Sequence, residues 1–217
     1  MKQTLSIEVF FDFICPWCLI GQRHLQRALE QLQVEQPDIE IDLRWRGVQL
    51  LPDMASTGEP FETFYRKRLG SEEAVRQRQA QVRAVAEAAG VTIDFSRISR
   101  MPNTADAHRL LQRAVALGDP ERVEALLAQL FAAYFDLGKD LGDSATLLHI
   151  AQACGLSPAQ VADCLRGDAS PFIGADDYPG EGVPCFRFNR QQVVSGAQPA
   201  SVLLAVMRDA LGQAALA

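Results

Sequence analysis

Two cysteines stand two residues apart near the start of the chain, in the stretch Cys15-Pro16-Trp17-Cys18. A thiolate is a strong nucleophile and a good metal ligand, and a second thiol at this spacing can close a disulfide with the first. The motif therefore predicts a dithiol redox centre, half of a metal site, or two core thiols without chemistry. The elements around the motif help to choose between them.

The cysteine pair is expected where a strand ends and a helix begins. Residues 5–13 alternate at first and then become almost entirely apolar, which is typical of a strand entering a buried sheet. Apolar residues recur at helical spacing over residues 16–33, and Pro16 suits a first helical turn because it lacks an amide hydrogen. The helix dipole then favours the thiolate of Cys15. We expect Cys15 to be the exposed nucleophile and Cys18 the more buried thiol that resolves a mixed disulfide.

The two alternatives fit the sequence less well. A metal site needs about four ligands, and the chain has no second Cys-x-x-Cys motif. Cys185 and the three histidines lack the spacing of metal ligands. Two chance core thiols would suit the middle of a helix better than a strand-to-helix junction. The five cysteines are too scattered for a disulfide scaffold.

The rest of the chain predicts an interrupted α/β fold. Residues 39–45 alternate strictly, which predicts a half-buried strand parallel to the first one across the helix. From about residue 52 to residue 167, helical periods predict five or six helices and no clear strand. A hairpin with its turn at Asn189-Arg190 and a final helix follow, over residues 183–188, 192–196 and 199–211.

These segments combine into a mixed sheet flanked by helices. We expect a β-α-β and β-β-α domain formed by residues 1–51 and 174–217, with an all-helical insertion over residues 52–173. The net charge of −6 argues against a nucleic-acid surface, and no apolar run is long enough to span a membrane. Glu8 and Asp12 interrupt the N-terminal apolar run, which is unlike a secretory signal and predicts a cytoplasmic protein. The oligomeric state stays open, with a dimer among the alternatives.

Four stretches carry a resemblance to a known family. "FDFICPWCLIG", "NTADAHRL", "GVPCFRFN" and "SGAQP" resemble the thioredoxin superfamily, specifically the DsbA-like FrnE group of dithiol oxidoreductases, over nearly the whole chain. The resemblance implies a thioredoxin-like domain interrupted by a helical domain. It implies exchange with disulfides or thiols of a protein or small molecule. We expect no tightly bound cofactor, with glutathione as the candidate co-substrate.

The resemblance also assigns residues that spacing alone does not. It implies a cis-proline facing Cys15, which here is Pro184, and substrate pairing with the backbone of Val183. Related 2-hydroxychromene-2-carboxylate isomerases and kappa-class glutathione transferases resemble the chain but have serine at the first catalytic position. The intact pair here favours an oxidoreductase, because dithiol exchange needs two thiols. A glutathione-dependent isomerase or transferase, or a redox-sensing adaptor, remains an alternative.

Further residues have both a functional and a structural interpretation. Asp12 could move a proton to or from Cys18, or simply be an exposed or capping carboxylate. His108 could contact substrate, or be a hydrogen-bonded structural histidine. We expect Trp17 to be exposed, where it could stack on substrate. Pro16 and Trp17 together should tune the redox potential.

The remaining cysteines have no defined role from the sequence. Cys154 and Cys164 flank a helix break and would form either a regulatory disulfide or two buried thiols, of which we favour the buried thiols. Cys185 follows Pro184 directly, which allows a redox role. Strand alternation would turn its side chain away from Cys15 instead.

Overall fold

The computed structural model describes residues 3–174, 176–180 and 182–214, and these fall into two compact units. The first unit comprises residues 1–48, 88–91 and 174–217, and the second comprises residues 49–87 and 92–173. The stretch 88–91 at the end of a helix was not expected in the first unit, because its sequence pattern only continues that helix.

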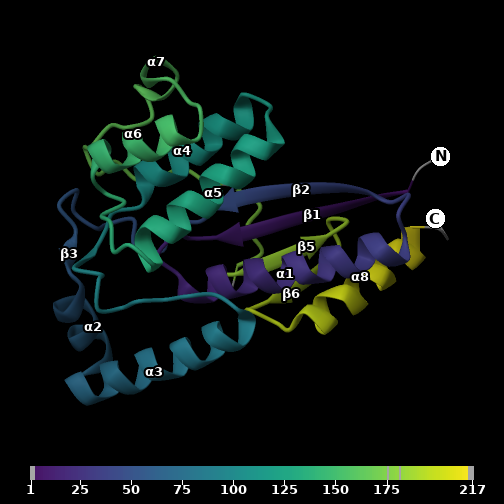
Figure 1. Cartoon of the computed structure of the whole chain (residues 1–217), viewed down its shortest axis with the longest axis horizontal. Coiled ribbons are helices and arrows are strands. Elements are labelled where there is room, and N and C mark those ends of the chain that lie inside the picture. Colours follow the sequence, from purple (N-terminus) through teal and green to yellow (C-terminus); the bar gives the residue numbers. More distant parts are fainter. Residues whose placement is uncertain (1–2, 175, 181, 215–217) are drawn as a thin grey trace. The chain divides into compact units, whose positions relative to one another are not determined.

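The first unit is a four-stranded mixed sheet with two helices (Figure 1). Its elements are β1 (Thr4–Phe11), α1 (Pro16–Glu35), β2 (Glu40–Gly47), β5 (Cys185–Phe188), β6 (Gln192–Ser195) and α8 (Ala200–Ala214). The strand order is β2-β1-β5-β6, with β1 and β2 parallel and the other neighbours antiparallel. The predicted β-α-β and β-β-α segments are therefore confirmed.

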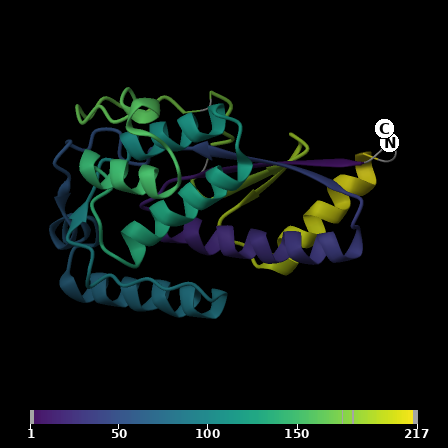
Figure 2. The same cartoon turned by 45° about the horizontal axis from the view of Figure 1, so that its top comes forward.

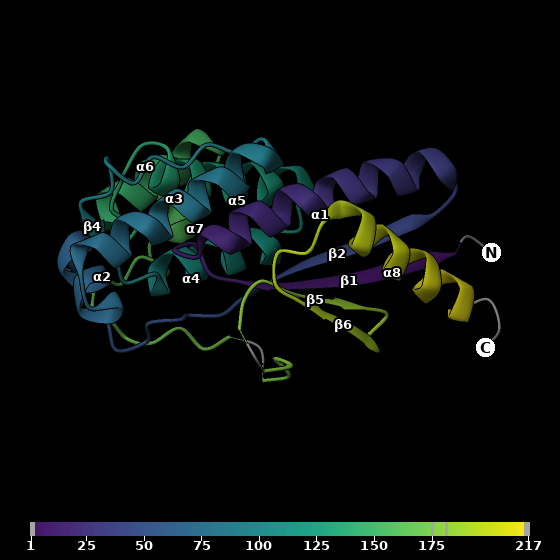
Figure 3. The same cartoon turned by 90° about the horizontal axis from the view of Figure 1, so that it is seen from below.

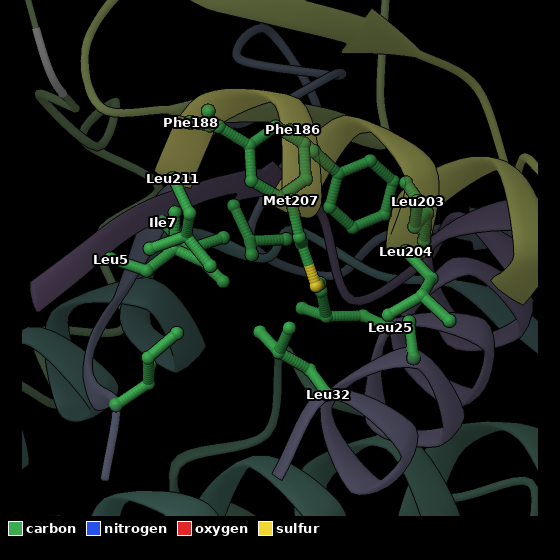
Figure 4. Close-up of a cluster of buried hydrophobic side chains, with 14 residues drawn as sticks. Leu5, Ile7, Leu25, Leu32, Phe186, Phe188, Leu203, Leu204, Met207 and Leu211 are labelled. Carbon is green, nitrogen blue, oxygen red and sulfur yellow. The ribbon is translucent and has the colours of Figure 1, made fainter. Parts of the chain in front are cut away.

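Both helices of the first unit cover the same face of its sheet (Figure 2). Leu5, Ile7 and Val9 of β1 are buried against these helices, in the apolar cluster drawn in Figure 4. Because side chains alternate along a strand, Glu8 and Phe10 point to the other face. The chain segment that leads into β5 lies on that second face (Figure 3). The further members of the cluster include Leu25, Leu32, Phe186, Phe188, Leu203, Leu204, Met207 and Leu211.

The β5–β6 hairpin turns at Asn189 and Arg190, as predicted. Both residues have positive φ, 47° and 59°, and the Gln191 amide donates to the Phe188 carbonyl at 3.0 Å, which closes a tight turn between the strands. The turn lacks the usual Asn-Gly pair, but the Asn189 side chain compensates. Its Oδ1 accepts from the Ser6 amide at 3.0 Å and its Nδ2 donates to the Ala210 carbonyl at 3.0 Å. One side chain thus ties the turn to β1 and α8.

The second unit is mainly helical, as expected. Its helices are α2 (Phe61–Leu69), α3 (Glu72–Ala89, whose last residues belong to the first unit), α4 (Ala105–Ala116), α5 (Pro120–Phe135), α6 (Ser144–Ala153) and α7 (Pro158–Val161). The expectation of no strand is wrong, since β3 (Glu59–Pro60) pairs with β4 (Arg100–Met101). Two residues are too few to leave a periodic signal in a sequence. None of the helices within residues 3–174, 176–180 and 182–214 combines the length and the hydropathy that a membrane span needs.

Candidate active site

The dithiol lies where the chain leaves β1 and enters α1. The Cys15 amide donates to the Asp12 carbonyl at 3.2 Å, which closes a turn after the strand. Cys15 is the N-cap residue, with an extended backbone (φ −89°, ψ 109°), and Pro16 begins the helix. The Cys18 amide then donates to the Cys15 carbonyl at 3.0 Å. The thiol of Cys15 therefore lies at the positive end of a 20-residue helix, as predicted.

The two thiols differ in surroundings, although Cys15 is less accessible than expected. Cys15 is 7% exposed and Cys18 is 2% exposed, so the prediction of an exposed nucleophile is wrong while the predicted order holds. Part of the cover comes from the remote residue Val183, whose carbonyl accepts from the Cys15 Sγ at 3.6 Å. Both thiols are free in the structure.

Cys18 is held in its protonated form. Burial first, then the hydrogen bond with Cys15 and the charge of Cys15, raise the pKa of Cys18 well above its ordinary value. A thiol that keeps its proton can donate a hydrogen bond to its neighbour. Cys15 is therefore the member of the pair that is suited to attack.

Asp12 is the acidic group next to Cys18. It is fully buried, so the alternative of an exposed carboxylate is wrong. Its charge adds to the rise in the pKa of Cys18, which its backbone partly offsets through a hydrogen bond. A carboxylate within electrostatic reach of a protonated thiol can accept its proton. The role of Asp12 as a proton shuttle stays a prediction.

The Val183–Pro184 segment completes the site within the first unit. The peptide bond between these residues is cis, as the resemblance implied. The Pro184 carbonyl accepts from the Gly196 amide at 2.8 Å, which anchors the segment to the end of the hairpin. Its ring packs on Gly21 of α1, where an added Cβ would lie 2.9 Å from Pro184 Cγ.

Sequence reasoning missed Gly21 as a site residue. The same added Cβ would lie 3.1 Å from Phe186 Cζ, so only glycine lets α1 approach the strand this closely. An isolated glycine inside a helical pattern was the available signal, because glycine lowers helix stability and persists where packing demands it. The sequence also offered no sign of Tyr178, which lies in an aperiodic loop and is described below.

The other predicted residues are placed as follows. Pro16 and Trp17 are half-buried in the first turn of α1, so the expectation of an exposed Trp17 is wrong. His108 lies in the second unit, on α4, and is 1% exposed. Its ring stacks on Phe172 with centroids 5.0 Å apart, which favours the structural interpretation. A contact between His108 and substrate stays a prediction.

The three remaining cysteines are free thiols. Cys185 pairs opposite Phe10, so its side chain lies on the sheet face that α1 and α8 do not cover. Burial raises the pKa of Cys185, and burial likewise raises those of Cys154 and Cys164. Among residues 3–174, 176–180 and 182–214, no three His, Cys, Asp or Glu side chains are grouped to hold a metal ion.

Known proteins share this architecture. A probable DsbA oxidoreductase from Streptomyces coelicolor is 28% identical with a TM-score of 0.81, covering 96% of this chain and 90% of that one. The cytosolic disulfide reductase DsbM from Pseudomonas aeruginosa, with GSH, is 18% identical with a TM-score of 0.57, covering 97% and 98%. A 2-hydroxychromene-2-carboxylate isomerase structure is 13% identical with a TM-score of 0.58, covering 98% and 99%. The last two likenesses concern the fold alone.

Sequence comparison agrees with the fold. The uncharacterized protein YwbO from Bacillus subtilis is 24% identical over 163 residues, which cover 75% of this chain and 72% of that one. The family model described as the DSBA-like thioredoxin domain matches residues 6–208, from β1 through the dithiol and the helical insertion into α8. The chain belongs to the family of DSBA-like thioredoxin domains.

Proposed function

We propose that this protein is a thiol–disulfide oxidoreductase in which Cys15 attacks and Cys18 resolves. The observation that carries the proposal is the inequality of the two thiols. Cys15 caps the positive end of α1, whereas Cys18 is buried one turn further in with its pKa raised. This arrangement separates an attacking thiolate from a thiol that reacts second.

The first step forms a mixed disulfide. The thiolate of Cys15 attacks one sulfur of a substrate disulfide, the substrate S–S bond breaks, and the other substrate sulfur leaves as a thiolate. The Val183 carbonyl, 3.6 Å from Cys15 Sγ, marks the wall beside which the substrate enters. A substrate strand pairing with the Val183 backbone would be held at the attacking sulfur.

The second step resolves the mixed disulfide. Cys18 loses its proton to Asp12 and attacks the sulfur of Cys15. The Cys15–substrate bond breaks, the second substrate sulfur leaves as a thiolate, and a Cys15–Cys18 disulfide remains. The substrate has gained two electrons that the dithiol has lost. The reverse sequence oxidises a substrate dithiol.

Turnover in the reducing direction needs a thiol that restores the dithiol. We propose glutathione for this role, in a cytoplasmic setting and without a tightly bound cofactor. The fold-level likeness to a cytosolic reductase with GSH supports this choice. The physiological substrate is then a disulfide-bearing protein or small molecule.

Turnover of a peptide disulfide by wild type, Cys15→Ser and Cys18→Ser, with and without glutathione, tests the proposal. Dithiol exchange predicts that both variants lose turnover. Full activity of Cys18→Ser that depends on glutathione would instead establish the isomerase or transferase chemistry of a single thiol. A wild type that exchanges nothing would leave the redox-sensing adaptor as the better account.

A further inference from the structure

A short segment before β5 is fastened to the uncovered face of the sheet in the first unit. This segment, here called the arm, consists of Asp176–Gly180 and Gly182 (Figure 3). Its glycines, acids and proline show neither a helical nor a strand period in the sequence. Its described side chains nevertheless make specific contacts with β1, β2 and β5.

Asp177 attaches the arm through charge. Its carboxylate accepts from Arg46 Nη2 at 3.1 Å and from Arg187 Nη2 at 2.5 Å. Arg187 also donates to the Asp177 carbonyl at 2.9 Å and, through Nε, to Glu8 at 2.7 Å. Glu8 and Arg187 are directly opposite in the β1–β5 register, so Glu8 positions the Arg187 side chain independently of the arm. The hydrogen bond from Arg187 lowers the pKa of Asp177, which keeps this carboxylate ionised.

Tyr178 attaches the arm through its ring and its hydroxyl. The ring packs on Phe10, with centroids 5.4 Å apart and planes tilted by 45°. The hydroxyl oxygen accepts from the Gly182 amide at 2.8 Å. Gly182 has a φ of 115°, a backbone that other residues rarely adopt, so the hydroxyl stabilises a bend that only glycine forms readily.

The bend at Gly182 leads directly into the wall of the site. Val183 follows, and its carbonyl contacts the Cys15 sulfur at 3.6 Å. Burial raises the pKa of Tyr178, and the charges of Cys185, Cys18 and Cys15 add to the rise. The ring is therefore within electrostatic reach of the dithiol, and its hydroxyl stays protonated at neutral pH.

We propose that Tyr178 is a positioning residue, whose hydroxyl holds the Gly182 amide so that the chain enters Val183 with the Val183 carbonyl facing Cys15. This inference rests on the proposed exchange reaction only for its effect on substrate. Tyr178 touches neither reacting sulfur in the proposed steps. It acts through Val183, and so controls how a substrate disulfide is bound beside Cys15.

The test deletes the hydroxyl with Tyr178→Phe, which keeps the ring packed on Phe10. A released carbonyl stabilises the Cys15 thiol less, so alkylation of Cys15 by iodoacetamide at pH 7 should be about threefold faster, the effect of part of one hydrogen bond. KM for a peptide disulfide should rise about threefold to tenfold while kcat changes little. The matched control is Tyr134→Phe, which removes a hydroxyl 3.7 Å from Met101 Sδ in the second unit. It should alter neither the alkylation rate of Cys15 nor KM for the peptide disulfide.

A second variant addresses the other attachment of the arm. Asp177→Asn removes the charge that binds Arg46 and Arg187. It should raise both the alkylation rate of Cys15 and KM for the peptide disulfide by no more than about threefold, since the carboxylate is partly solvated. Unchanged alkylation of Cys15 in Tyr178→Phe would overturn the inference, whatever Asp177→Asn shows and whether or not the stability of either variant falls. Wild-type protein without exchange activity would contradict the proposed function alone, because the alkylation measurement still tests the position of Val183.

Discussion

Substitution of Gly21 by alanine tests whether α1 and the Val183–Pro184 segment are held at the distance the site requires. Apolar carbons rarely approach within about 3.5 Å, so the new methyl, 2.9 Å from Pro184 Cγ, asks the ring to retreat by roughly 0.6 Å. Such overpacking costs about 1–3 kcal/mol. Alanine recovers about 0.5–1 kcal/mol of helix propensity relative to glycine. We expect a net loss of up to about 2.5 kcal/mol in the free energy of unfolding.

Gly212 provides the matched control. It lies in α8, and an added Cβ there would meet nothing within 4 Å. Gly212→Ala should therefore be neutral or stabilise the protein by up to about 1 kcal/mol. The difference between the two variants in urea unfolding removes most of the propensity contribution. It should be about 1–3 kcal/mol, with unchanged dependence on urea concentration.

The same substitution should affect the chemistry. A displaced Pro184 carries Val183 with it, and the Val183 carbonyl is already 3.6 Å from Cys15 Sγ. A misplacement of this size should lower kcat/KM for peptide disulfide exchange on the order of tenfold. If Gly21→Ala is as stable as Gly212→Ala and exchanges at the wild-type rate, the close contact between α1 and Pro184 is not what positions the site.

Three further predictions concern other parts of the first unit. Asn189→Gly keeps the positive φ but removes two side-chain hydrogen bonds, and should lower the unfolding free energy by about 1–3 kcal/mol. The control Arg190→Gly should stay within about 0.5 kcal/mol of wild type. Equal unfolding curves for the two variants would contradict the role of the Asn189 side chain. Asp12→Asn should lengthen the lifetime of the mixed disulfide at pH 7 roughly a hundredfold, measured by quenched mass spectrometry, and an unchanged lifetime would exclude proton transfer to Asp12. Because the pKa of Cys18 is raised in the folded protein, its contribution to stability is complete below about pH 8.5 and is lost as the pH rises toward the folded pKa. The stability difference between reduced wild type and Cys18→Ala should therefore fall above that pH by up to about 1.4 kcal/mol per pH unit, and a flat difference in urea unfolding would show that Cys18 is not held protonated.

The local elements of the site were predictable from the sequence, because each depends on neighbouring residues. Alternation of apolar residues gave β1 and β2, helical spacing gave α1, and Pro16 indicated where that helix begins. These patterns were enough to place Cys15 at a helix N-terminus. The same reasoning found the β5–β6 hairpin, although the compensating contacts of Asn189 with β1 and α8 required the structure.

The surroundings of the site were not predictable, because they come from residues distant in sequence. The Cys15 thiol is in contact with Val183, which is 168 residues away along the chain. The role of Gly21 depends on the Pro184 ring, and that of Tyr178 on Phe10 and Gly182. None of these pairs has a local spacing that a sequence pattern could reveal. The cis bond before Pro184 and the approach of this segment to Cys15 were anticipated, and there the family resemblance supplied the information.

Trapping of the mixed disulfide tests most directly whether Cys15 attacks and Cys18 resolves. Cys18→Ser, incubated with a peptide disulfide and quenched in acid, should accumulate one covalent peptide per chain, and digestion with mass spectrometry should locate it on Cys15. Cys15→Ser should carry none. A peptide attached to Cys18 in Cys15→Ser, a peptide attached to Cys185, or no peptide attached to Cys18→Ser would contradict the account.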